Sequence, residues 1–302
     1  MADDYNTTTS SSIDLSQLPA PTVIETLDFD ALYQDILGKY KASYPAFIDA
    51  LESDPVVKLL EVCAYREMLL RQRINDAAKA VMLAYASGSD LDNLAALFGV
   101  KRLTITPADP VNNIAAVMES DADLRARILL APESFSVAGP TGAYRYHALS
   151  ADADVLDASA SSPEAGVVLI TVLSRTGDGT ASDALLAAVS SHLSDDSIRP
   201  LTDCVKVQSA GIVPFSIDAT IKTYAGPSAE IVLQQAQSQL TEYLTKNKRI
   251  GHDITISGIH AALTVSGVQN VILAQPTADL IIDETQVAYC TGISVKNGGV
   301  AE

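Results

Sequence analysis

The side chains that could do chemistry in this 302-residue chain are few and scattered. Its four histidines are His147, His192, His252 and His260. None of them stands in an HExxH pattern or beside a cysteine, so their spacing does not predict a metal site. His252 and Asp253 are adjacent and could orient one another, but no candidate nucleophile accompanies them. The histidines therefore give no support for metal-dependent or nucleophilic catalysis.

Paired carboxylates are the second place where acid–base chemistry could arise. Asp121 with Asp123 and Asp152 with Asp154 lie on short Ala/Asp segments, where helix caps and solvated faces are more typical. The Gly-Asp-Gly run at 177–179 lacks the further acidic positions of a calcium loop and the Gly-Lys-Ser/Thr of a phosphate loop, which favours a tight turn between a strand and a helix. We therefore expect no catalytic residue, no metal ligand, no cofactor and no enzyme activity.

Charge and composition exclude further classes. The net charge of −17 opposes nucleic-acid binding, which depends on clustered Lys and Arg, and opposes adhesion to anionic membranes. The strand-like run at 167–173 is too short to cross a membrane, and the N-terminus lacks the features of a secretory signal. Three widely spaced cysteines, Cys63, Cys204 and Cys290, favour reduced thiols. Cations gather around predicted helices, which is typical of ion pairs at interfaces: Arg66, Arg71, Arg73, Lys101, Arg102, Arg125 and Arg127.

The N-terminal third is predicted to be helical. Residues 1–27 are rich in Ser, Thr and Pro and are expected to form an extended arm. A helix is expected from Asp28, limited by Gly38 or by Tyr44-Pro45. Asp54 followed by Pro55 predicts the start of a longer helix that runs to about Ala86. One apolar stripe of that helix comprises Val56, Leu59, Leu60, Cys63, Leu70, Ile74, Ala78 and Val81.

The apolar residues of the long helix cover more than one face. We therefore expect one side to pack in its own domain, where Leu60, Leu70 and Ile74 are placed. The other side is expected to meet a partner. The candidate interface residues are Tyr65, Met68 and Leu69, which fall largely outside the main stripe, together with Arg73.

A corner is predicted after the long helix. Gly88 is expected to end that helix, and Ser89 with Asp92 resembles a capping box for a short second helix that stops at Gly99. Residues 101–110 then form an extended segment that leads into a Pro-containing linker. A helical N-terminal domain is therefore assigned to 28–105.

Two small α+β domains are predicted beyond the linker, at 106–211 and 212–290, with a flexible tail at 291–302. The fold class is thus α+β, with a helical N-terminal domain followed by two small α+β domains. Strand–helix segment 166–194 resembles 215–246, and helix–strand segment 142–160 resembles 258–275. A short strand is also expected at 253–257. Proteases are expected to cut first within 106–116 or near 211.

Four segments resemble, in order and spacing, the baseplate J-like proteins of contractile-tailed phages. GSDLDNLAALFGVKR is similar to the family's LDxLA helix with its Gly-Val turn and Arg, and ESDADLRARI is similar to its acidic-then-Arg helix. The stretch from Thr141 to Ser174 resembles the middle signature, and IHAALTVSGVQNVILAQP resembles the C-terminal helix–strand unit. The resemblance extends from about residue 13 to about residue 290, and no single motif carries it.

The resemblance implies a structural subunit of a baseplate wedge in the virion tail, assembled in the cytoplasm of a bacterial host. The implied partners are a second copy of the chain, a tail protein I-type wedge protein, a sheath-initiator-type baseplate protein and neighbouring wedges in a six-fold ring that rearranges on sheath contraction. Nucleic acid and membrane are not among them. Two alternatives stay open: a wedge subunit of an R-type bacteriocin or other headless contractile injection particle, and a tail-associated hydrolase, which would need a pocket with convergent polar groups.

Overall fold

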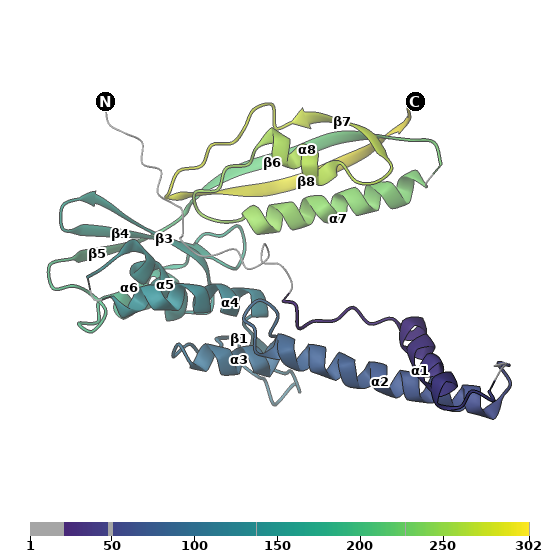
Figure 1. The fold of residues 1–302 in the computed structure, drawn as a ribbon. Helices are drawn as coiled ribbons and strands as arrows, with labels where there is room; N and C mark the ends of the chain where they lie inside the picture. The colour runs from purple at the N-terminus through teal and green to yellow at the C-terminus, as the bar shows by residue number, and fades with distance from the viewer. Residues whose placement is uncertain (1–20, 48–50, 137, 227, 302) are drawn as a thin grey trace, which may run out of the picture. The chain divides into compact units, whose positions relative to one another are not determined.

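The structure, a computed structural model, describes residues 21–47, 51–136, 138–226 and 228–301. These residues form two compact units, one with residues 21–101 and 120–125 and the other with 102–119 and 126–301. Helices come first along the chain and small sheets follow, which confirms the predicted α+β class (Figure 1). None of the described helices is long and apolar enough to cross a membrane.

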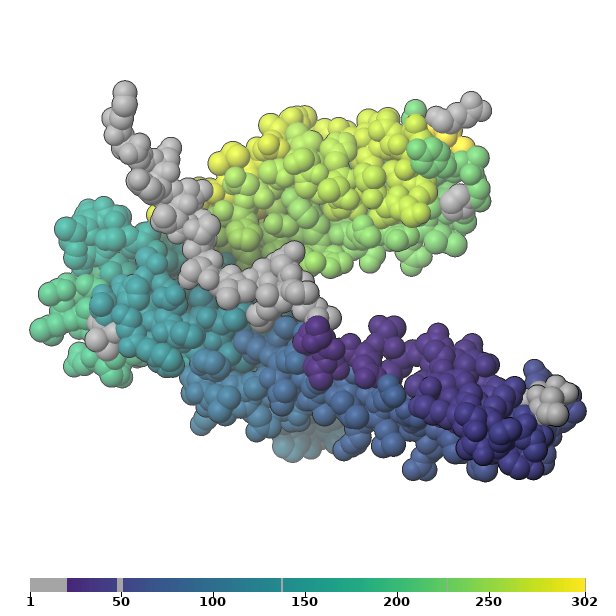
Figure 2. Space-filling model, in the orientation of Figure 1, coloured from purple at the N-terminus to yellow at the C-terminus, as the bar shows by residue number. Residues whose placement is uncertain are grey.

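The helical unit is built on α1 (Phe29–Ser43) and α2 (Pro55–Ala80), which lie against each other (Figure 2, purple and blue). Both helices begin where the capping residues predict. The carboxylate of Asp28 accepts the Ala31 N–H at 2.9 Å, and that of Asp54 accepts the Val56 N–H at 2.9 Å. Each carboxylate thus satisfies one of the amides that a helix leaves unpaired at its first turn.

The end of α2 was predicted wrongly. The helix stops at Ala80, about one and a half turns before Ala86. The reason lies in tertiary contacts, because the guanidinium of Arg125 donates hydrogen bonds of 2.7 Å to the carbonyls of Leu83 and of Ala86. These carbonyls therefore belong to an irregular turn and not to a continuing helix.

The corner after α2 also differs in detail. Gly88 has φ +53° and is the first residue of α3 (Gly88–Ala96), with Ser87 at the N-cap position. Gly88 therefore does not end the long helix, and the expected capping box of Ser89 and Asp92 is wrong. Gly99 does lie past the helix end with φ +71°, the conformation for which glycine is favoured at helix C-termini.

The expected linker is a hairpin. Strand β1 (Thr104–Thr106) pairs with β2 (Val117–Met118), and an isolated bridge joins Asp109 to Ile114 nearer the tip. Helix α4 (Asp121–Leu130) follows, with a short 3-10 helix, η2 (Ala131–Phe135), after it.

The middle module, residues 141–209, contains one three-stranded sheet. Its elements in chain order are α5 (Thr141–Ala151), β3 (Val155–Glu164), β4 (Val167–Ser174), α6 (Asp183–Leu193) and β5 (Cys204–Ser209). Strand β4 is central, antiparallel to β3 and parallel to β5. Both helices contribute to the core against the sheet, with Ala148 and Val189 packed among Ile170 and Val172.

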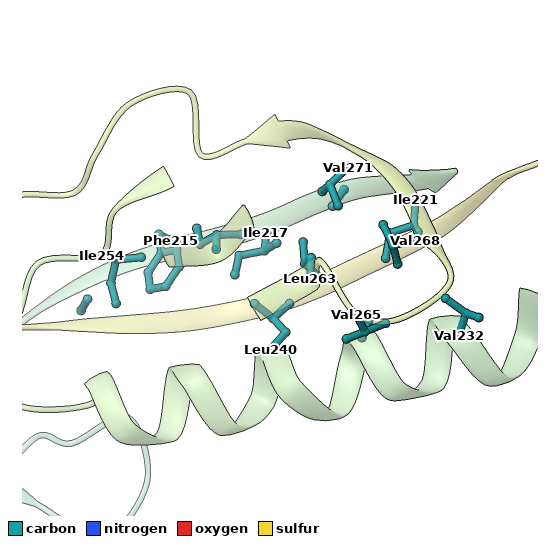
Figure 3. Packing of buried hydrophobic residues seen from close by; sticks show 14 of the residues in the cluster. Phe215, Ile217, Ile221, Val232, Leu240, Ile254, Leu263, Val265, Val268 and Val271 are labelled. Carbon is teal, nitrogen blue, oxygen red and sulfur yellow. The ribbon is translucent and has the colours of Figure 1, made fainter. Parts of the chain in front are cut away.

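The C-terminal module, residues 211–300, has the larger core. Its elements are β6 (Gly211–Thr223), α7 (Ala229–Asn247), α8 (Ile256–Leu263), β7 (Val268–Gln275) and β8 (Gln286–Val300). Strand β6 is central, antiparallel to β7 and parallel to β8. Figure 3 shows Val232 and Leu240 of α7 pointing toward the sheet, where Ile217 and Ile221 belong to the same buried cluster.

Two expectations for the C-terminal third were wrong. The predicted strand at 253–257 is a single bridge, Ile254 with Leu280, because α8 already begins at Ile256. The predicted flexible tail at 291–302 is strand over most of its length, since β8 continues to Val300 and pairs with Thr223 there. A polar, Gly-containing segment gains this order from a neighbouring strand that is distant in sequence.

The two modules share one sheet arrangement. In each, a central strand (β4 or β6) is followed by a helix and has one antiparallel and one parallel neighbour. The antiparallel neighbour follows a helix in both, as α5–β3 and as α8–β7. The segment pairs that look alike in sequence, 166–194 with 215–246 and 142–160 with 258–275, therefore occupy equivalent places, but in opposite chain order.

We propose that the domain boundaries lie near 105 and 211, and proteolysis tests the first of them. The hairpin tip is open, with Val111 92% exposed. Near 211 the chain is protected, because Ala210 is buried and the Gly211 N–H donates to Thr285 O at 2.9 Å. We expect thermolysin to cut first within 107–116 and to leave two large fragments, identified by mass spectrometry. A first cut between 204 and 215 would contradict the structure.

Candidate assembly interface

The structure brings two of the four histidines together. His147 of α5 and His192 of α6 have ring centroids 5.8 Å apart, and the Nε2 of His192 is buried without a hydrogen-bond partner among the described residues. Asp253, beside His252, accepts the Ile282 N–H at 2.7 Å and so positions backbone. No cluster of three or more potential metal ligands occurs in the described parts of the chain.

The carboxylate pairs and the glycine turn have structural contacts. Asp121 accepts the Gly88 N–H at 3.1 Å, and Asp154 accepts the Ser174 hydroxyl at 2.7 Å. In the Gly-Asp-Gly turn, Gly177 and Gly179 have φ of +61° and +109°, and Asp178 accepts the Thr180 N–H. A side chain at Gly179 would also overlap Leu173. These contacts agree with the turn and cap roles expected from sequence.

Several of the clustered cations have anchoring contacts within the chain. Arg71 forms ion pairs with Glu25 at 2.9 Å and Glu67 at 2.7 Å. Arg127 forms a buried, two-pronged pair with Glu119, at 2.7 Å and 2.6 Å. The guanidinium of Arg102 donates to the main-chain oxygen of Glu119 at 2.7 Å. Bidentate pairing of this kind uses the planar fork of arginine, and it explains these cations without a bound ligand.

One side of α2 packs within its own unit. Its buried residues are Val57, Leu60, Ala64 and Asn75, and Leu60 is thus placed as expected. The side-chain amide of Asn75 forms hydrogen bonds with the backbone of Glu25, accepting from its N–H at 3.0 Å and donating to its carbonyl at 2.8 Å. The extended segment before α1 is therefore fixed along α2 by backbone pairing, which no apolar pattern could have indicated.

The other side of α2 leaves large apolar side chains in solvent. Between 47% and 62% of each of these residues is exposed: Leu59, Val62, Tyr65, Leu69, Leu70 and Ile74. The expectation that Leu70 and Ile74 lie in the home core is therefore wrong. The sequence did not distinguish the side of α2 that faces inward. That side is marked by Asn75, which pairs with the backbone of Glu25, and by Arg71, which pairs with its side chain.

The exposed residues fall into two stripes at helical spacing. Val62, Tyr65 and Leu69 form the first, which we call stripe A. Leu59, Cys63, Leu70 and Ile74 form the second, stripe B. Arg66 and Arg73, both exposed, lie between the stripes at a spacing of seven residues.

Of the four candidate interface residues, Tyr65, Leu69 and Arg73 are exposed on this side of α2, whereas Met68 is half-buried. Their contact with a partner stays a prediction. Contiguous exposed apolar surface of this extent on one helix is typical of a protein–protein interaction site. The arrangement can bury side chains against other helices.

Comparison with known proteins covers most of the chain. Models of the baseplate J-like family match as N-terminal domain at residues 52–109, central domain at 136–209 and C-terminal domain at 215–296. Baseplate protein J of Escherichia phage P2 is 48% identical over 299 residues, which is 96% of this chain and 99% of that protein. A chain in the cryo-EM structure of the anti-feeding prophage baseplate is 17% identical with a TM-score of 0.39, and the match covers 61% of this chain and 47% of that one.

The histidine pair makes stability depend on pH. Burial lowers the pKa of both His147 and His192, His192 lowers that of His147 further, and Asp195 opposes the effect at His192. The unfolded chain therefore takes up these protons first, so the stability of the neutral pair is fully present above about pH 6.5 and is lost as the pH falls toward the folded pKa values.

We expect the fall in melting temperature between about pH 7.5 and pH 5.5 to be smaller in a His147→Gln/His192→Gln variant than in the parent protein. Thermal unfolding followed by circular dichroism measures it. A His252→Gln/His260→Gln variant controls for the loss of two imidazoles. Equal pH dependence of the parent and the first variant would show that the pair does not titrate with folding.

Proposed function

Because this chain belongs to the baseplate J-like family and is a structural subunit of a virion tail baseplate, we propose that α2 is the helix through which it joins a baseplate wedge. The exposed apolar side of α2 carries this proposal. A baseplate subunit must bind neighbours, and this side of α2 combines large apolar residues with two arginines at helical spacing.

Two separate stripes favour two partner helices. Stripe A and stripe B lie on different sides of the row formed by Arg66 and Arg73, so one helix cannot cover both. We assign one stripe to a second copy of the chain and the other to a tail protein I-type wedge protein. Burying a large apolar side chain fully contributes about 1.5–3 kcal/mol, so the six large apolar residues of the two stripes, Cys63 left aside, can together support a stable bundle.

The negative net charge of the chain suggests a role for Arg66 and Arg73 at the proposed interface. Each copy has a net charge of −17, so two copies repel each other at long range. Arg66 and Arg73 place positive charge on the face that meets the partner, where carboxylates of a second acidic chain can pair with them. Tyr65 adds an aromatic ring with a polar end, and Tyr and Arg are enriched among the residues that dominate binding energy.

Beyond the bundle, we propose that the sheet modules contact the sheath-initiator-type protein and neighbouring wedges, forming a six-fold ring that rearranges when the sheath contracts. We also propose that the chain has no catalytic activity. The contacts of the described groups support this, since Asp121 and Asp253 accept backbone N–H groups, Asp154 accepts the hydroxyl of Ser174, and His147 lies against His192.

A charge placed in stripe A should block assembly without unfolding the chain. We expect Leu69→Glu to keep the parental melting temperature within a few degrees, because Leu69 is already 47% exposed, and to abolish co-purification with the second wedge protein. This expectation commits stripe A to the wedge protein and stripe B to a second copy of the chain. Leu70→Glu in stripe B should therefore abolish co-purification of a second, differently tagged copy. Co-expression, affinity purification and thermal melts measure both properties.

Two matched variants make the result interpretable. Leu60→Glu places the same charge in the home core and should unfold the helical unit, since Leu60 is buried. Gln72→Glu adds the charge at an exposed polar position of α2, where it replaces the hydrogen bond from Gln72 to Asp76 of 2.7 Å by a like-charge pair. It should therefore lower the melting temperature slightly and leave co-purification unchanged. If Leu69→Glu and Leu70→Glu both co-purified like the parent, α2 would not be the binding helix.

The absence of catalysis has its own test. A variant with Gln at His147, His192, His252 and His260 should form infectious particles in nearly parental yield, corrected for the amount of folded subunit, because no reaction depends on an imidazole. Infectivity assays on purified, fully assembled particles measure this. Complete loss of infectivity with intact assembly would contradict the proposal.

A further inference from the structure

We infer that the middle and C-terminal modules move as one rigid body, held together by buried contacts centred on Asp157. This inference is independent of the role proposed for α2. It begins from the chain connection, because β5 ends at Ser209 and β6 begins at Gly211. Only Ala210 separates the two strands, and it is buried.

The backbone is paired on both sides of this connection. Ala210 donates its N–H to Val172 O at 2.8 Å, within the middle module. Gly211 donates its N–H to Thr285 O at 2.9 Å, within the C-terminal module. A flexible linker would leave these amides to solvent, whereas here the chain passes from one sheet to the other without an unpaired turn.

A separate apolar cluster lies across the junction. It consists of Leu173 from the middle module, Ile250 and Val287 from the C-terminal module, and Ala210 between them, all buried. Leu156 and Ile212 pack against it. Gly179 is part of the same arrangement, since a Cβ at this position would overlap Leu173. Rotation of one module against the other would expose this cluster to water.

Asp157 provides the central polar contact. It is 2% exposed and lies on β3. One carboxylate oxygen accepts from Arg145 Nη2 at 2.9 Å and from the Ala158 N–H at 3.0 Å, both in the middle module. The other accepts the Ile250 N–H of the C-terminal module at 3.1 Å. A buried carboxylate needs its full set of donors, so the charge itself favours the docked arrangement.

Further contacts cross the junction around Asp157. Arg249 Nη1 donates to Leu156 O at 2.7 Å, and the Ser159 hydroxyl donates to Glu284 O at 2.6 Å. Lys248 Nζ reaches Gly177 O at 3.3 Å and lies 5.5 Å from the centroid of the Tyr289 ring. Donors and acceptors come from both modules, so the junction fixes orientation as well as proximity. Any rearrangement within the subunit must therefore occur outside residues 141–300.

Pulsed electron–electron resonance on the full chain tests the inference. Spin labels are placed on exposed Cys204 and on Ser238→Cys, in a Cys63→Ser/Cys290→Ser background. The parent is expected to give one narrow distance distribution. Asp157→Ala should broaden or split it, and Arg249→Ala/Ser159→Ala, which spares both module cores, should broaden it less. The control Asp218→Asn removes an exposed carboxylate that pairs with Lys296 and should leave the width unchanged.

Amide exchange of 15N-isoleucine-labelled protein gives a second readout that needs no spin label and no truncated side chain. In the parent, the Ile250 amide should exchange nearly as slowly as Ile221 in the centre of the sheet. In Asp157→Asn it should exchange roughly 10- to 100-fold faster while Ile221 is unchanged, as expected for weakening a hydrogen bond to a charged acceptor. A broad distance distribution in the parent, or a parental Ile250 amide that exchanges at the rate of an open loop, would overturn the inference.

Discussion

A buried ion pair joins the hairpin to α4 and α5. Glu119 and Arg127 are each 5% exposed, and their side chains meet at 2.6 Å and 2.7 Å. Glu119 also accepts the Leu103 N–H, and Arg127 donates to the Ser150 hydroxyl, so the hairpin, α4 and α5 are joined at one point. Removing one partner of such a pair typically costs about 3–5 kcal/mol, because the remaining charge stays buried.

Local sequence patterns predicted where helices begin better than they predicted which distant segments contact each other. A helix begins beside Asp28 and another beside Asp54, as expected, because a cap depends on residues within one turn. The end of α2 was missed because Arg125, far along the chain, binds the carbonyls there. The order of residues 291–300 was missed for the same reason, since β8 depends on pairing with β6.

The candidate interface shows the same limit. The sequence indicated that α2 has too much apolar surface for one face, and the exposed residues agree with this. It could not indicate which stripe faces inward, because Val57 and Leu60 are no more apolar than Leu59 and Leu70. That choice is made by Asn75 and Arg71, which bind the backbone and side chain of Glu25, 50 and 46 residues earlier. Sequence periodicity has no access to such contacts.

The single residue between β5 and β6 has a consequence for how chains of this fold can vary in length. Side chains alternate between the faces of a strand, so adding one residue at Ala210 would reverse which side chains of β6 point into its core, unless a bulge absorbed it. The length of the hairpin loop around Val111 does not set which way any core side chain points, because the loop connects the same pair of strands whatever its length. Insertions and deletions are therefore tolerated at the hairpin and selected against at the strand junction.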